Sequence, residues 1–137
     1  MRRLNVRQAQ LQECIEESMF ALGSRPSLQN GEILLLQLVK GDAKQAGKLH
    51  GRIEYALVFS HIEADPDGKI SRKHWPKENR VWKWIIHGSE TLRFAPFSLE
   101  DMDLSKDYSG QSNAQKLSAA DEQLVLAHIH HSARRTR

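Results

Sequence analysis

The stretch RIEYALVFSHIE, residues 52–63, is apolar on both of the faces that an extended chain would present. Side chains alternate between the two faces of a strand, so the apolar residues fall into two sets: Ile53, Tyr55, Leu57 and Phe59 on one face, and Ala56, Val58 and Ile62 on the other. A strand that buries both faces is typical of the centre of a sheet. This stretch therefore predicts a long central strand.

Other strand signals lie on both sides of it. Residues 32–39 contain Ile33 and three consecutive leucines and suit a second buried strand. After the central strand, the Asp-Pro-Asp-Gly sequence at 65–68 is a strong turn signal. Residues 81–87 and 91–95 then predict a hairpin that turns at Gly88 and Ser89.

Helical patterns flank these strands. The stripe Leu11, Ile15, Met19 and Leu22 predicts an amphipathic helix over residues 5–22, within an N-terminal segment 1–24 that ends at Gly23. Between the first two strands, residues 42–49 predict a short helix.

The second half of the chain carries two further helix starts. Ser98 suits the cap of a short helical turn, and Ser118 the start of a C-terminal helix. We expect that helix to turn Leu124, Val125 and Ile129 inward.

The composition is that of one ordinary globular domain, 1–137, with 39% hydrophobic and 27% charged residues. The single cysteine, Cys14, excludes an intramolecular disulfide and is typical of a cytoplasmic protein. No apolar run is long enough to span a bilayer, and no secretory signal is visible. The expected fold class is α+β: a small curved, mostly antiparallel sheet or open barrel, with flanking N- and C-terminal helices, a core at 31–130 and a mobile basic tail at 132–137.

The main functional signal is the segment 69–84, which mixes six basic residues with all three tryptophans. With one acid, Glu78, it carries a formal charge of +5, whereas the whole chain carries +3. Cations attract phosphates and aromatic rings stack on bases. The candidate nucleic-acid contacts here are Arg72, Lys73, Lys77, Arg80, Trp75, Trp82 and Trp84. Trp75 is the preferred stacking residue, since it precedes Pro76; the alternative for Trp82 and Trp84 is a core wall.

A second basic surface is expected on the predicted helix at 42–49. Lys40, Lys44 and Lys48 are four residues apart and would share one helix face, close to Arg52. A groove between this face and the segment 69–84 would suit a phosphate backbone. The alternative is a solvated helix face.

No catalytic or cofactor signature stands out. The chain has no glycine-rich phosphate loop and no nucleophile elbow. His128 and His131 would face one way on a helix, but no acidic residue completes a metal site there. We therefore expect no cofactor, no metal and no catalytic residues.

The order of segments resembles the PUA-like superfamily, and especially its EVE-like branch, over residues 31–129. The similar stretches are the Gly31-Glu32 pair before an apolar strand, the aromatic centre of 55–62, the Trp-bearing strand at 82–84, the Pro-Phe-Ser-Leu-Glu-Asp turn at 96–101, and the Leu-Ser pair at 117–118. The resemblance implies a domain that reads a modified base in DNA or RNA through an aromatic pocket. Chains of that branch usually begin with a strand that bears aromatic residues, whereas a helix over residues 5–22 is expected here.

The leading hypothesis is therefore a non-catalytic module that binds DNA or RNA, with no membrane contact. One alternative is a subunit that docks on another protein through Leu11, Ile15 and Met19. The other is a small ASCH-like nucleic-acid-processing enzyme, which would need a lysine and a carboxylate in one pocket; no convincing pair is visible in the sequence.

Overall fold

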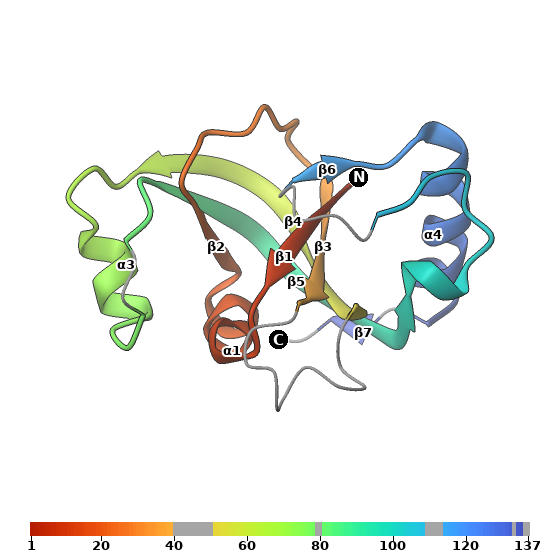
Figure 1. Cartoon of the computed structure of the whole chain (residues 1–137), viewed down its shortest axis with the longest axis horizontal. Coiled ribbons are helices and arrows are strands. Elements are labelled where there is room, and N and C mark those ends of the chain that lie inside the picture. Colours follow the sequence, from red (N-terminus) through yellow and green to blue (C-terminus); the bar gives the residue numbers. More distant parts are fainter. Residues whose placement is uncertain (40–50, 79–80, 109–113, 133, 136–137) are drawn as a thin grey trace.

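The computed structural model describes residues 1–39, 51–78, 81–108, 114–132 and 134–135, and it has an α+β fold (Figure 1). Its strands are β1 (Arg2–Val6), β2 (Met19–Leu22), β3 (Ile33–Leu38), β4 (Arg52–Ala64), β5 (Trp84–Ser98), β6 (Gln115–Lys116) and β7 (Arg134–Arg135). Its helices are α1 (Gln8–Glu17), α3 (Lys69–His74) and α4 (Ala119–Ser132), with a 3-10 turn η1 (Leu99–Asp101). None of the described helices is long and apolar enough to cross a membrane.

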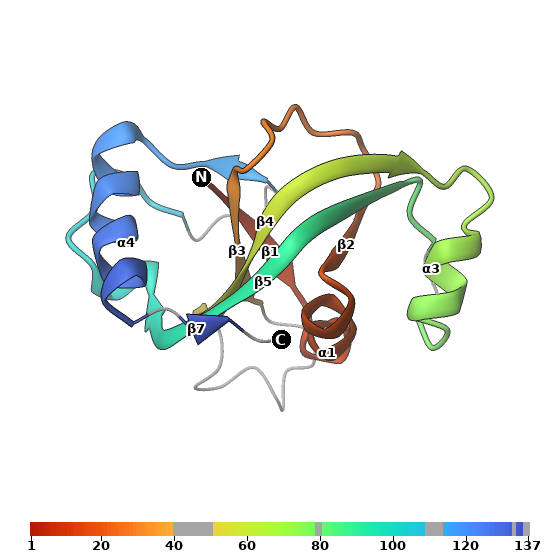
Figure 2. The same ribbon diagram turned by 180° about the vertical axis from the view of Figure 1, so that it is seen from behind.

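The strands form one open mixed sheet in the order β2-β5-β4-β3-β1-β6, and β7 pairs with β5. β4 lies between β3 and β5, which confirms the predicted central strand. Among the described strand pairs only β1 and β3 run parallel. β4 and β5 form a long curved ribbon that carries α3 at one end of the molecule, while α4 lies at the other end (Figures 1 and 2).

Each face of the sheet carries its own hydrophobic cluster. Leu34 and Leu36 of β3 belong to one cluster, with α1 and β2, and Leu35 belongs to the other, with α4. The predicted faces of β4 were wrong at two residues: Ile53 packs in the α4 cluster rather than with Leu57, and Ile62 packs against the α1 cluster rather than with Ala56. Register shifts between Ile53 and Tyr55 and again between Val58 and His61 interrupt the alternation, as β-bulges do.

The predicted N-terminal helix at 5–22 was wrong at both ends. The chain begins with β1, and α1 ends at Glu17 because Ser18 adopts the left-handed conformation with φ 50°. Tertiary hydrogen bonds hold Ser18 there: its carbonyl accepts from the Gly88 backbone N–H at 2.7 Å, and its Oγ lies 2.5 Å from the Thr91 hydroxyl. Met19 and Leu22 consequently lie in β2 and are buried in the core.

The predicted hairpin at Gly88 was also wrong, because β5 runs straight through it. A Cβ at Gly88 would lie 3.2 Å from the Val58 carbonyl oxygen and 3.3 Å from Leu57 Cβ. The register between β4 and β5 shifts at this point. Gly88 therefore allows two strands to approach closely at a bulge. Glycine in a sheet commonly has this role as well as a role in turns.

The C-terminal part follows the sequence more closely. The Ser98 hydroxyl accepts a hydrogen bond from the Glu100 N–H at 3.3 Å and caps η1, and the Ser118 hydroxyl accepts from the Asp121 N–H at 3.2 Å at the start of α4. Val125 and Ile129 are buried, but Leu124 is 48% exposed, contrary to prediction. The predicted mobile tail contains the short strand β7, and the helix predicted at 42–49 lies outside the described residues.

Candidate nucleic-acid interface

The basic segment forms a small lobe built on α3, and buried polar groups fix its shape. Asp65, 5% exposed, accepts hydrogen bonds from the backbone N–H groups of Ile70 and Ser71 at 3.1–3.2 Å. The Ser71 hydroxyl donates to the Trp82 carbonyl and accepts from the Trp82 N–H, both at 3.2 Å. The turn predicted at 65–68 is therefore confirmed, and it leads directly into the helix α3.

Two of the three candidate tryptophans lie inside this lobe. Trp75 is 5% exposed and Trp82 8% exposed, and their rings meet edge to face with centroids 6.0 Å apart. The Trp75 indole N–H donates to the Gln10 carbonyl of α1 at 3.3 Å. The Trp75 ring, preferred from the sequence as the base-stacking residue, packs in the core between α1 and α3 and has no face open to a base in this structure.

The cations of the lobe point to solvent. Lys69, Arg72 and Lys73 are exposed and stand three and four residues apart, so they share one face of α3. Lys77 and Lys83 are exposed as well, and none of these five cations forms an ion pair with another described residue. The acid of the segment, Glu78, pairs with Arg7 at 3.2 Å, and Arg80 lies outside the described residues.

Trp84 differs from the other two tryptophans. It is half-buried and belongs to neither hydrophobic cluster, although it pairs with Leu22 of β2 and Ala64 of β4. The Arg25 guanidinium carbon lies 5.3 Å from the ring centroid, which is a cation–π distance. Sequence reasoning missed Arg25, because only the pairing of β2 with β5 brings this isolated loop residue to Trp84.

Arg52, the residue of the second basic surface that the structure describes, lies far from the lobe. Arg52 begins β4 and α3 follows its far end, so the 13-residue strand separates them by roughly 40 Å at the usual rise per residue. Arg52 pairs with Glu54 at 2.6 Å and lines a cavity of about 170 Å³ beside α1, together with Tyr55. Arg52 therefore does not adjoin segment 69–84, and Lys40, Lys44 and Lys48, whose helix face was expected to line the groove, lie outside the described residues.

Other reactive side chains serve packing. Cys14 is fully buried, and burial raises the pKa of its thiol far above its ordinary value, so no thiolate forms near neutral pH. The His128 ring packs against Phe97 with centroids 4.6 Å apart, and its Nε2 lies 2.9 Å from the Ala95 carbonyl oxygen. Of the apolar side chains in the N-terminal docking alternative, Met19 is buried and Leu11 packs against the core, whereas Ile15 is half-buried and belongs to neither hydrophobic cluster.

The lobe thus combines exposed cations with a partly accessible aromatic ring, and we group these residues as one candidate surface. It consists of Lys69, Arg72, Lys73, Lys77, Lys83, Trp84 and Arg25, and is called the α3 basic surface below. Comparisons with family models, with curated proteins and with solved structures found no match to this chain.

Proposed function

We propose that this protein is a non-catalytic nucleic-acid-binding module that contacts the phosphate backbone through the α3 basic surface. The observation that carries the proposal is the set of five exposed cations without an ion-pair partner among the described residues. Ion-paired cations must give up their partner to bind phosphate, whereas these need only release counterions. The acid that would oppose them is already engaged with Arg7.

The base contact in this proposal is Trp84. Its ring is half-buried, so the lobe holds it in place while part of it stays accessible. Base–aromatic stacking contributes about 1–3 kcal/mol per base. A stacked base lies on the ring face opposite Arg25 or displaces the guanidinium. Recognition of a modified base, in DNA or RNA, is the finer form of the proposal.

A PUA-like, EVE-like architecture is part of the same proposal. The departure noted in the sequence is removed in part: the chain starts with the strand β1 in the sheet, although β1 carries none of the aromatic residues typical of that branch. The long β4–β5 ribbon and the open curved sheet are compatible with such a domain. Fold alone does not decide function, so the binding test stands on its own.

Neutralising two lysines of the surface is expected to weaken binding by roughly tenfold at 0.1 M salt and to lower the salt slope by about 2. The variant is K73Q/K77Q, and the measurement is fluorescence anisotropy of labelled oligonucleotides at several salt concentrations. Both side chains are exposed and unpaired among the described residues, so the fold should be unaffected.

The matched control is K106Q/K116Q, which removes the same charge from two exposed lysines at the α4 end of the molecule. We expect it to bind within about twofold of the wild type, since charges beyond a Debye length of about 10 Å are screened. Equal losses in the two variants would mean that the attraction is a property of the net charge and that the α3 surface is no interface.

A further inference from the structure

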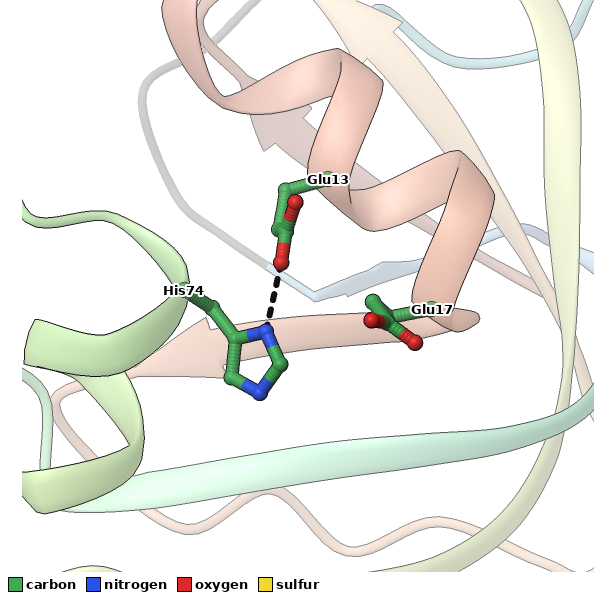
Figure 3. Close-up of side chains that lie close together, drawn as sticks. All are labelled: Glu13, Glu17 and His74. Carbon is green, nitrogen blue, oxygen red and sulfur yellow. Dashed lines mark hydrogen bonds and ion pairs between the residues drawn. The ribbon is translucent and has the colours of Figure 1, made fainter.

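Three side chains from two elements converge where the lobe meets α1 (Figure 3). Glu13 and Glu17 stand one turn apart on α1, and His74 is the last residue of α3. One ligand atom from each lies within 4.8 Å of the other two. The His74 Nδ1 is already 2.5 Å from Glu13 Oε2.

The electrostatics of this cluster favour a cation. Two carboxylates four residues apart on a helix repel each other. They also lie in the second half of α1, whose last turn holds no basic residue, and the negative end of a helix disfavours further negative charge. His74 contacts Glu13, but Glu17 is exposed and makes no hydrogen bond with another described residue. Part of the negative charge is therefore left uncompensated.

We propose that Glu13, Glu17 and His74 form a binding site for a divalent transition-metal ion, with Zn²⁺ as the best fit. One imidazole nitrogen and two carboxylate oxygens suit Zn²⁺, whereas Mg²⁺ and Ca²⁺ prefer oxygen ligands alone. Zinc ligand distances of about 2.0–2.2 Å place neighbouring ligand atoms roughly 3.5 Å apart. The three ligand atoms already lie within 4.8 Å of one another, and the exposed Glu17 side chain is free to adjust toward that spacing.

The bound ion would link α3 to α1, because its ligands come from both helices. It takes the place of a proton between His74 and Glu13, so the imidazole binds in its neutral form. Three protein ligands leave at least one coordination position for water or another ligand. The site does not depend on nucleic-acid binding, although His74 is next to Lys73 of the α3 basic surface.

The test compares Zn²⁺ affinity in E17Q and E16Q by competition with a chromophoric chelator. E17Q removes one ligand while leaving the His74–Glu13 contact in place, and we expect its affinity to fall at least tenfold. E16Q makes the same change one residue away, where Glu16 accepts a hydrogen bond only from Gln12 among the described residues, and we expect less than a twofold change. All seven histidines are the same in both proteins, so a difference in Zn²⁺ affinity between them is due to the Glu17 carboxylate.

Thermal unfolding supplies a second readout. Zn²⁺ should raise the Tm of the wild type and of E16Q but leave that of E17Q and H74Q nearly unchanged, since ligand binding stabilises only proteins that bind. Equal Zn²⁺ affinities in the wild type, E17Q and H74Q would overturn the proposal and assign binding to other histidines. Failure of the wild type to bind Zn²⁺ at micromolar concentration would overturn it as well.

Discussion

Replacing Trp75 with alanine is expected to lower the free energy of unfolding by about 3–5 kcal/mol. The ring is 5% exposed, packs on Trp82 and donates its N–H to the Gln10 carbonyl. Alanine leaves a cavity between α1 and α3 and removes the partner of a buried carbonyl. Urea denaturation followed by circular dichroism measures the loss.

Trp84→Ala is the matched comparison, because it removes the same side chain from a half-buried position outside both clusters. We expect it to cost less than about 2 kcal/mol of stability while it weakens oligonucleotide binding by roughly five- to 150-fold. The opposite pattern, a stable W75A protein that no longer binds nucleic acid, would restore Trp75 as the stacking residue and contradict the placement of its ring.

Replacing Asp121 with asparagine is the second large effect, with an expected drop in Tm of roughly 10 °C. The carboxylate is 1% exposed and accepts hydrogen bonds from the Ser105 N–H at 2.8 Å, the Ser105 hydroxyl at 2.9 Å and the Tyr108 hydroxyl at 2.6 Å. An amide cannot accept this whole set, so buried donors lose their partner. D103N, at an exposed carboxylate nearby, is the control and should shift Tm by less than about 2 °C.

The contribution of Asp121 should also depend on pH. Burial by itself raises the pKa of this carboxyl, but the hydrogen bonds from Ser105 and Tyr108 outweigh it and hold the pKa well below its usual range. The unfolded value is about 3.9. Because the folded-state pKa is the lower one, the stabilisation is present above about pH 4 and is lost as the pH falls further.

Urea unfolding of the wild type and D121N between pH 7 and pH 2.5 measures this dependence. The difference in stability should stay constant from pH 7 to pH 5 and narrow below pH 4. A difference that grows on acidification would show that the carboxyl is destabilised in the folded protein, contrary to its hydrogen bonding.

The strands with apolar side chains on both faces were predictable, because β3 and β4 are long enough for the alternation to be visible. The predictions that were wrong were those of where a helix or strand ends. Ser18 ends α1 through bonds to Gly88 and Thr91, which lie about 70 residues away in the sequence. The sequence around Gly88 is typical of a turn, but in the structure Gly88 lies at a β-bulge between β4 and β5. Both outcomes depend on the pairing of β2 with β5, which no local pattern encodes.

The candidate site also has features that the sequence predicts and features that depend on tertiary contacts. The exposure of the cations was predictable from their residue type, since charged side chains are seldom buried. The burial of Trp75 did not, because it depends on α1 folding against α3. The cluster of Glu13, Glu17 and His74 was invisible for the same reason: α1 and α3 are separated by about 50 residues of chain. Only the glutamate pair with helical spacing hinted at it.

The most direct test of the account is a titration of the wild type and W84F with short single- and double-stranded DNA and RNA, plain and base-modified, followed by tryptophan fluorescence at low and moderate salt. The account predicts quenching in the wild type that is largely lost in W84F, with affinity that falls steeply as salt rises. Quenching that persists unchanged in W84F would contradict the role of Trp84. No binding to any oligonucleotide at 50 mM salt would contradict the proposed function itself.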